Sequence, residues 1–467
     1  MKSVALHNLG CKVNSYELDV MQQMLQEKGY RIVPFDQIAD IYIINTCTVT
    51  NIADRKSRQM LHRAKQKNPD AVVVAVGCYV QTGEKTIAMD DSIDLAIGNN
   101  RKRDLAQILE AYLEGKSLSE EGVLVSEANK ADAKTLHHTT VIDINHTDEY
   151  EEMKLTRTAE HTRAYIKIQD GCNQFCSYCV IPFARGRVRS RKEEDILAEI
   201  RGLVERGYRE VVLTGIHISS YGVDFEEKGV YTGESRLIDL IEHIHNEIQE
   251  LERIRLGSLE PRVITESVAA RLAALPKLCP HFHLSLQSGS DSVLKRMNRR
   301  YTTGEYFQGV HFLRNAFAHP AITTDVIVGF PGETEEEFLE TRKFVEQVGF
   351  FEMHIFKYSR RAGTQADKMP GQLSDKVKSA RSDVLFQLEQ AQSAGFRSDY
   401  IGKEAEILWE DKRTIQGKEY WLGHTRDYVK VALPAGEKNL SNTLSVVLVK
   451  AFLTEEILTG ECVNRDL

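Results

Sequence analysis

The sequence has little proline, almost no tryptophan and no long hydrophobic run. Its 467 residues include 10 prolines and 2 tryptophans, and 42% of them are hydrophobic. This composition predicts ordered globular structure over most of the chain. The longest apolar run, residues 71–80, is too short to cross a bilayer, which needs about 20 residues. Residues 1–10 lack the cationic start and apolar core of a signal peptide, so we expect a cytoplasmic protein.

An excess of positive charge is also absent. The formal net charge is -8, so whole-chain charge does not indicate nucleic-acid binding, and any such site must be local. In a reducing compartment, the 8 cysteines are more often metal ligands or core residues than disulfides. The length predicts about two to four domains, at roughly 100–200 residues each.

Residues 1–125 alternate apolar runs rich in Val and Ile with helical patterns. Helices are expected at 14–29, ended by Gly29, and at 51–69. This βαβ alternation predicts an α/β fold with a doubly wound parallel sheet. The three expected strands lie in residues 3–11, 40–47 and 71–78.

Residues 126–160 are polar and show weak periodicity. They predict a linker, with one short strand around Val141 to Ile144.

Residues 161–396 return to strand–helix alternation, and their helices have clear starts. Ser190 with Glu193, and Thr334 with Glu337, have the spacing of capping boxes. Six strand–helix units predict a partial (β/α)6 barrel, whose chemistry would lie at the carboxyl ends of the strands. The expected strands are 164–171, 210–216, 253–260, 281–289, 322–330 and 350–359.

Residues 397–460 follow a helix expected at 372–395, and they contain four short strand patterns with turn signals between them. The pattern predicts a small antiparallel β-barrel. Trp409 and Trp421 lie in this region. They could stack against RNA bases, and the alternative is that they belong to the core. Residues 398–460 hold 8 Lys or Arg against 10 Asp or Glu, so this domain is not basic.

Three cysteines, Cys172, Cys176 and Cys179, have the spacing C-x3-C-x2-C at the end of the first barrel strand. Four thiolates would suit zinc or a complete iron–sulfur site, whereas three leave one metal position open. An open iron can bind S-adenosylmethionine through its amine and carboxylate. A structural zinc ion completed by a distant residue is the alternative.

The segment "CNQFCSYC" resembles the cluster loop of the radical S-adenosylmethionine (SAM) superfamily, and Tyr178 has the place of the aromatic residue that lies against adenine there. The continuation "VIPFARGRVRSR" resembles the methylthiotransferases of that superfamily. Similar segments cover nearly the whole chain: "LGCKVNSYE", "INTCTVT", "VGCYVQ", "LTGIHISSYG", "SLEP", "HLSLQSGSDSVLKRMNRRYT" and "DVIVGFPGETEEEF". The expected C-terminal barrel also resembles the TRAM domain, a small RNA-binding module.

Three further cysteines, Cys11, Cys47 and Cys78, each end an expected strand of the N-terminal sheet. Neighbouring strands lie about 4.8 Å apart, and the carboxyl edge of such a sheet is where ligands bind. Alone, each cysteine is typical of a core residue. Together, and with the resemblance, they are expected to hold a second [4Fe–4S] cluster with one iron free. Cys279 and Cys462 have no comparable setting and are expected to be structural.

The N-terminal segment "NLGCKVNSYE" most resembles the branch that modifies N6-threonylcarbamoyladenosine in tRNA. The resemblance implies methylthiolation at C2 of this nucleoside at position 37, with two [4Fe–4S] clusters and SAM as cofactors. One SAM methylates a cluster sulfur, and a second is cleaved to a 5′-deoxyadenosyl radical that removes the C2 hydrogen. The implied partners are the tRNA anticodon loop, an electron-donor protein and a sulfur source; we expect a monomer without membrane contact. No catalytic side chain beyond the cluster ligands is predicted.

Polar residues at strand ends are candidates for SAM contacts. The resemblance places Thr214 and Gly215 at the contact with the methionine amine. Strand-end capping or core satisfaction is the alternative for each. The other candidates are Ser285, Gln287, Ser288 and Asp325.

Basic residues gather in two places despite the acidic total. Arg55 and Arg58 belong to a basic helix, and four arginines follow the cluster loop. Such patches suit phosphate contacts; for the first, a solvated helix face is the alternative. The four arginines are Arg185, Arg187, Arg189 and Arg191.

Two other functions remain open. One keeps the chemistry and changes the substrate, to a ribosomal-protein aspartate or to isopentenyladenosine in tRNA. The other is an RNA-binding protein whose six clustered cysteines hold only structural metal.

Overall fold

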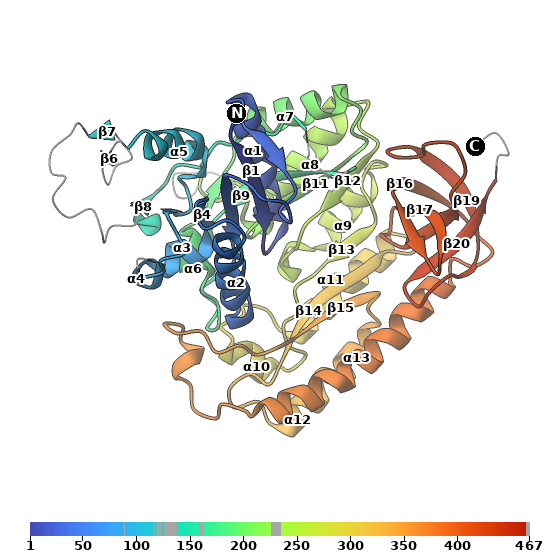
Figure 1. Ribbon diagram of the computed structural model, residues 1–467. Coiled ribbons are helices and arrows are strands. Elements are labelled where there is room, and N and C mark those ends of the chain that lie inside the picture. Colours follow the sequence, from blue (N-terminus) through green and yellow to red (C-terminus); the bar gives the residue numbers. More distant parts are fainter. Residues whose placement is uncertain are drawn as a thin grey trace.

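A computed structural model describes residues 1–87, 89–115, 117–118, 124–125, 138–157, 162–225 and 235–463. Three parts follow one another along the chain (Figure 1): an N-terminal sheet with helices, a central set of strand–helix units, and a C-terminal barrel reached through the long helix α13 (Asp375–Ser398). Among the helices of the described residues, none is long and apolar enough to cross a membrane.

The N-terminal part is a six-stranded parallel sheet, as expected. Alternate side chains of its strands fill two cores: Val4 and Ile43 belong to the core with α1 (Lys12–Glu27) and α5 (Leu105–Leu113), whereas Tyr42 faces α2 (Asn51–Lys67). Helices therefore cover both faces, which makes the sheet doubly wound. The strand order is β2 (Arg31–Val33), β1 (Ser3–Asn8), β3 (Ile41–Thr46), β4 (Val72–Gly77), β5 (Leu95–Ile97) and β8 (His138–Thr140).

The segment expected to be a linker takes part in this core. The strand predicted at residues 141–144 is wrong in position: β8 occupies His138–Thr140, beside β5, and a 3-10 turn, η2, spans Ile144–His146. Further on, Met153 and Leu155 are buried against α1. Their burial explains why a polar stretch is ordered here. The remainder of the predicted linker, 126–137 and 158–160, lies outside the described residues.

The central part holds the six expected strands, all in parallel pairing. They form two sheets. Two isolated parallel bridges, Ile254 to Leu278 and Leu259 to Leu284, link the chain at the first sheet to the chain around β13 of the second. The first sheet contains β9 (Ala164–Asp170), β11 (Glu210–Gly215) and β12 (Arg253–Leu256), with the short antiparallel β10 (Arg189–Ser190) at its edge. The second contains β13 (His281–His283), β14 (Ala321–Val328) and β15 (Glu352–Lys357).

Helices between these strands pack on one side of the sheets and bury the largest apolar core. The capping box of Thr334 and Glu337 at α12 is confirmed, but that of Ser190 and Glu193 is wrong. Helix α7 begins at Glu193 after Lys192, and the Ser190 hydroxyl donates to Asp224 instead. These helices are α7 (Glu193–Glu205), α8 (Arg236–Glu247), α9 (Glu266–Ala273), α10 (Asp291–Arg296), α11 (Thr303–Ala316) and α12 (Glu335–Val348), whereas the short α6 (Ile181–Arg185) contacts the N-terminal part.

The C-terminal part is a closed five-stranded barrel. Four strands were expected; the fifth, β20, ends at Cys462 and pairs in parallel with β18 and antiparallel with β19. Trp409 is fully buried and Trp421 is 5% exposed, so both belong to the barrel core and neither is available for stacking on RNA. The strands are β16 (Glu404–Ile415), β17 (Lys418–His424), β18 (Lys430–Pro434), β19 (Leu444–Phe452) and β20 (Ile457–Cys462).

Candidate active site: two cysteine trios joined by a buried ion network

The loop that carries Cys172, Cys176 and Cys179 follows the carboxyl end of β9, and its backbone is tightly held. At Gly171, φ is +72° and a Cβ atom would lie 1.7 Å from the Arg187 carbonyl oxygen, so only glycine fits this turn. The Cys172 N–H donates to the Gly186 carbonyl across 3.0 Å. The three thiols are half-buried and lie beyond the carboxyl end of a parallel strand, where α/β sheets bind their ligands.

The sulfur atoms of this loop have polar donors. Arg299 Nη1 donates to Cys176 Sγ across 3.2 Å, and the Ile181 N–H donates to Cys179 Sγ across 3.4 Å. Such hydrogen bonds stabilise negative charge on sulfur.

The second trio, Cys11, Cys47 and Cys78, comes from three adjacent strands of the N-terminal sheet. Cys11 and Cys47 follow β1 and β3, and Cys78 starts α3 (Cys78–Thr82) directly after β4. A Cβ atom on Gly10 would lie 3.0 Å from Cys47 Sγ, which shows how closely the β1 and β3 ends approach. The parallel sheet thus brings the three residues together at its carboxyl edge. Cys279, by contrast, is fully buried, as its predicted structural role requires.

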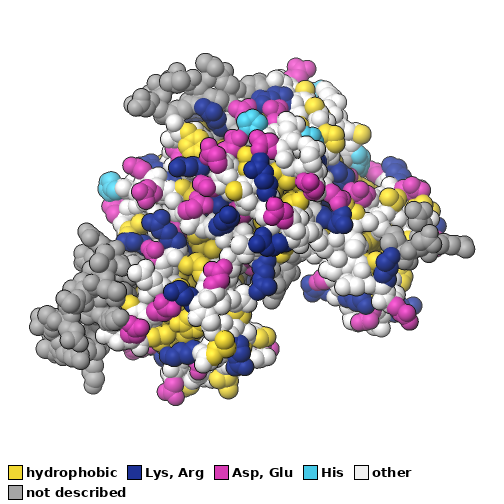
Figure 2. Space-filling model, turned by 90° about the horizontal axis from the view of Figure 1, so that it is seen from above, with side chains coloured by type: hydrophobic (Ala, Val, Ile, Leu, Met, Phe, Trp, Pro, Cys, Tyr) yellow, Lys and Arg dark blue, Asp and Glu magenta, His cyan; other side chains and the backbone are white. Residues whose placement is uncertain are grey.

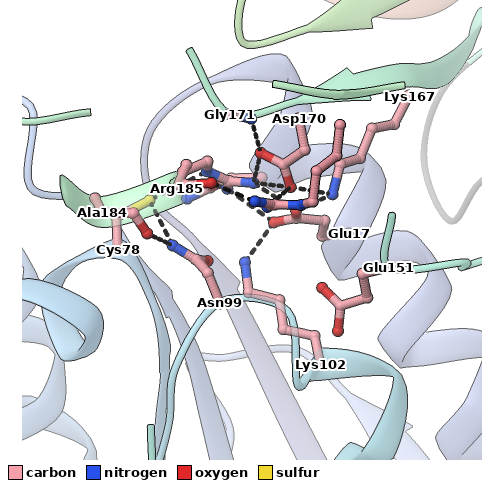
Figure 3. Close-up of polar contacts among 12 residues, drawn as sticks. Glu17, Cys78, Asn99, Lys102, Glu151, Lys167, Asp170, Gly171, Ala184 and Arg185 are labelled. Atoms are coloured by element: carbon pink, nitrogen blue, oxygen red, sulfur yellow. Dashed lines mark hydrogen bonds and ion pairs between the residues drawn. The ribbon is translucent and has the colours of Figure 1, made fainter. Parts of the chain in front are cut away.

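Cys78 is in contact with a buried network of charges (Figure 3). Arg185 Nε and Asn99 Nδ2 each donate to Cys78 Sγ across 3.4 Å. Arg185 also pairs with Glu17 of α1 across 2.7 Å and with Asp170 of β9 across 3.2 Å. One guanidinium therefore joins the N-terminal part, strand β9 of the first central sheet, and the loop after the first cysteine trio.

Two lysines complete this network. Lys102 pairs with Glu17, and Lys167 pairs with both Glu17, across 2.8 Å, and Asp170, across 2.7 Å. Burial opposes ionisation of Glu17, but Arg185 and the two lysines outweigh it and hold the pKa of this carboxyl well below its usual value. All of these groups are almost fully shielded from solvent, so the network depends on complete pairing.

The donor set of each trio fits an iron–sulfur cluster. Cysteine thiolates are the ligands of [4Fe–4S] clusters, and three of them leave one iron open, whereas a structural zinc ion takes four protein ligands. The residues therefore fit the cofactor that the cysteine spacing implies.

Burial affects the protonation of these thiols. It raises the pKa of Cys47 and of Cys172 to about 11, and that of Cys179 to about 12. Because iron binds the thiolate, loading either site must release protons that burial otherwise retains.

The arginines after the cluster loop are mostly internal, which corrects the prediction of a phosphate-binding patch. Arg185, Arg189 and Arg191 are at most 1% exposed, and Arg191 pairs with Glu199. Buried, paired guanidinium groups cannot reach a tRNA phosphate. Only Arg187 is exposed, and its guanidinium lies 4.5 Å from the ring centre of Phe175.

The basic helix α2 differs, because Arg55 is exposed and Arg58 is half-buried. Arg58 Nη1 donates to the Tyr79 hydroxyl across 3.3 Å. Figure 2 shows Lys and Arg side chains interspersed with Asp and Glu over the face seen from above. The face seen there therefore carries no continuous basic patch.

The expected SAM contacts differ in their exposure and in their backbone conformation. Tyr178 is half-buried beside Phe330, with ring centres 6.4 Å apart. Gln287 has φ +66°, a left-handed conformation that is costly away from glycine and clusters at functional sites. Ser288 is fully buried and its hydroxyl contacts Thr341 of α12 across 3.2 Å. Ser288 thus has a packing contact in place of the expected cofactor contact.

The remaining candidates lie at strand ends or within the barrel. Thr214 and Gly215 end β11, and Thr214 is buried. Ser285 follows β13 and is half-buried. Asp325 is within β14, its Oδ2 atom 3.3 Å from His283 Nε2.

Several residues of the site were not singled out from the sequence. Arg299, Asn99 and Glu17 contact or support the cysteines through side chains that tertiary structure alone brings together. Glu260 was missed too; it accepts from Gln174 of the cluster loop across 3.2 Å. Arg299 and Glu260 lie in motifs quoted above, "HLSLQSGSDSVLKRMNRRYT" and "SLEP", which was the available signal.

Comparison with known proteins defines the class first. Residues 166–345 match the family described as the radical SAM superfamily, and residues 3–98 match "Uncharacterized protein family UPF0004". A solved radical SAM methyltransferase, TsrM from Kitasatospora setae with cobalamin and a [4Fe-4S] cluster bound, is similar in fold. Its TM-score is 0.55 at 16% identity, covering 78% of this chain and 74% of that chain. The protein is a radical SAM enzyme, and SAM and a [4Fe–4S] cluster are its cofactors.

Curated relatives then define the family. The chain is 37% identical to "Threonylcarbamoyladenosine tRNA methylthiotransferase MtaB" of Bacillus subtilis, over 97% of this chain and 94% of that protein. It is 34% identical to "tRNA-2-methylthio-N(6)-dimethylallyladenosine synthase" of Desulfitobacterium hafniense, over 99% and 97%. The chain belongs to the methylthiotransferase family of radical SAM enzymes.

Proposed function

We propose that this enzyme converts N6-threonylcarbamoyladenosine at position 37 of tRNA, in the anticodon loop, to its 2-methylthio derivative. The observation that carries the proposal is the near-complete coverage by relatives named MtaB, at 37% identity over 97% of the chain. The motif "LGCKVNSYE" around Cys11 supports the same branch.

We propose that Cys172, Cys176 and Cys179 hold the cluster that binds SAM, and that Cys11, Cys47 and Cys78 hold a second [4Fe–4S] cluster. When bound, the first cluster supplies the electron that cleaves SAM to methionine and a radical able to remove an aromatic hydrogen. The protein's own residues position these groups. Arg299 and Arg185 donate hydrogen bonds to one sulfur of each trio, and the buried network around Glu17 holds Arg185 in place beside Cys78.

The domain division is part of the proposal: residues 1–125 form the domain of the second cluster, and 126–160 connect it to the next domain while adding β8, Met153 and Leu155 to its structure. Residues 161–396 form a partial (β/α)6 radical SAM barrel, and 397–460 form a TRAM-like RNA-binding domain. Within this division, Tyr178 lies against adenine, and Thr214, Gly215, Ser285, Gln287 and Asp325 contact the rest of SAM. An adenosine in a loop must be splayed out to reach such a site. Arg55, Arg58 and Arg187 are the proposed phosphate contacts.

A second candidate substrate, dimethylallyladenosine in tRNA, is favoured by the relative from Desulfitobacterium hafniense. The two substrates differ in the group on N6: one carries an amino-acid carboxylate and the other a hydrocarbon.

Nucleoside mass spectrometry of tRNA from a deletion strain tests the proposal. We expect loss of 2-methylthio-N6-threonylcarbamoyladenosine alone, restored by the wild-type chain and not by Cys172→Ala. Loss of the 2-methylthio dimethylallyl nucleoside instead would assign the second substrate. Intact tRNA with a lost ribosomal-protein modification would overturn both.

A further inference from the structure

Three potential metal ligands that belong to neither cysteine trio lie on neighbouring strands of the second central sheet. His283 ends β13, Asp325 is within β14 and His354 is within β15. In the parallel register, Asp325 is directly opposite His354, and His283 is opposite Thr323, two residues before Asp325. The three side chains therefore share one face of the sheet.

That face is the inner one. The residues that alternate with the three, Phe282, Val326 and Ile355, belong to or pack against the apolar core under the helices. Side chains of successive strand residues point to opposite faces. His283, Asp325 and His354 therefore point away from the helices, into the space that the strands enclose.

Their geometry matches that of ligands to one ion. One imidazole nitrogen of each histidine and one Asp325 oxygen all lie within 4.8 Å of one another. His283 Nε2 and Asp325 Oδ2 are 3.3 Å apart. Two ligands at about 2.1 Å from a tetrahedral ion would be separated by roughly 3.4 Å.

His283 is also oriented as a ligand. Its Nδ1 atom lies 3.1 Å from the Thr323 hydroxyl, while Nε2 is shielded from solvent and has no hydrogen-bond partner among the described residues. A metal-binding imidazole is typically held in this way through its other nitrogen. Nε2 lies beside the Asp325 carboxylate without the geometry of a hydrogen bond, and a cation bound by both atoms would satisfy them.

We propose that His283, Asp325 and His354 bind a divalent first-row transition-metal ion of the zinc type. Two imidazoles and a carboxylate are a donor set for such ions. His354 is exposed and the Asp325 side chain is 27% accessible, so an ion can enter from solvent. Three protein ligands leave at least one position open to an oxygen donor of a molecule bound in the enclosed space. The proposal is independent of the tRNA substrate and of the cluster assignments, and it gives Asp325 to the ion in place of the SAM contact proposed above.

The test is metal analysis of the full-length enzyme after anaerobic cluster reconstitution. The protein is incubated with Zn²⁺, desalted, and analysed for zinc and iron in the same sample. We expect bound zinc in the wild type, with affinity lowered more than about 100-fold in His354→Ala and Asp325→Asn and with iron unchanged. Thr323→Val keeps all three ligands and should weaken zinc binding about 10–100-fold, as loss of an orienting hydrogen bond does.

His146→Ala is the matched control, because His146 is exposed and lies 2.7 Å from Asp143, with no third ligand beside them among the described residues. This variant should bind zinc as the wild type does. Zinc should also raise the melting temperature of the wild type and the control, and not that of His354→Ala. Absence of bound zinc in the wild type, as expected if His283 is simply protonated against Asp325, would overturn the proposal. Zinc retained unchanged in both ligand variants would overturn it equally.

Discussion

Arg185 donates its Nε–H to the sulfur of Cys78 across 3.4 Å, although the two residues belong to different parts of the chain. Arg185 ends the short helix after the first cysteine trio, and Cys78 belongs to the second. The guanidinium gives this sulfur a buried charged hydrogen-bond donor. The contact makes the second trio dependent on the barrel that carries the first.

Replacing Arg185 by Met should therefore remove iron from the second site. The side chain keeps similar bulk but leaves Cys78, Glu17 and Asp170 without their shared cation. We expect about half the iron of the wild type after reconstitution, since the Cys172 trio keeps its own cluster. Arg187→Met, two residues on at an exposed position, should keep full iron content. Full iron in Arg185→Met would contradict this dependence.

The Glu17→Gln variant should be much less stable. Glutamine keeps the shape but removes the charge that Arg185, Lys102 and Lys167 share, leaving buried cations in excess. The expected cost is about 3–5 kcal/mol at neutral pH, measured by urea unfolding. Glu110→Gln is the control, because its pair with Lys28 is half-exposed and its loss should cost less than about 1 kcal/mol.

The stability lost in Glu17→Gln should also depend on pH. The native pKa of Glu17 lies below its usual value of 4.5, so the carboxylate stabilises the fold above that value and this contribution is lost as pH falls through the native pKa. The difference between wild type and variant should thus shrink in acid. A difference that stays constant between pH 7 and pH 3 would argue against an ionised Glu17.

The two trios should differ in what their loss abolishes. Cys172→Ala should eliminate 5′-deoxyadenosine formation from SAM with reductant, because the electron reaches SAM through that cluster. Cys47→Ala should retain part of this activity and lose the methylthiolated nucleoside. Chromatography of both products from the same reaction separates the two effects. Product formation by Cys47→Ala would show that the second cluster is assigned wrongly.

Cluster loading should be faster at higher pH. The pKa of Cys47 and of Cys172 is raised to about 11 by burial, so only a small thiolate fraction exists near neutrality. That fraction rises about tenfold per pH unit below the pKa. Iron uptake followed by absorbance should therefore be slower at pH 7 than at pH 9. A rate independent of pH in this range would indicate thiols already deprotonated.

Exposed arginines of α2 should contribute to tRNA binding through charge alone. Arg55→Ala should weaken binding across tRNAs of different sequence and reduce the salt slope of log K by about 1. Arg31→Ala is the control, because this exposed residue begins β2 at the opposite, amino edge of the sheet. Equal salt slopes for Arg55→Ala and the wild type would remove α2 from the interface.

Much of the architecture was predictable because it depends on local pattern. Val- and Ile-rich runs separated by amphipathic helices predicted the parallel sheets, and Cys11, Cys47 and Cys78 could be placed at one edge because parallel strands end together. The strand β20 was missed, since "ILTGEC" is short and only its pairing with β18 and β19 defines it. The predicted Ser190 capping box does not form, because the Ser190 hydroxyl donates its hydrogen bond to Asp224, which is distant in sequence.

The sequence by itself determined which residues can ligate iron and which fold carries them, because cysteine spacing and hydrophobic period are local properties. Tertiary structure alone decided the roles of the charged residues. The series Arg185, Arg187, Arg189 and Arg191 has one composition, yet three are buried and one is exposed. Whether an arginine meets solvent or a carboxylate such as Glu17 depends on packing between segments more than 160 residues apart, and no local pattern encodes that contact.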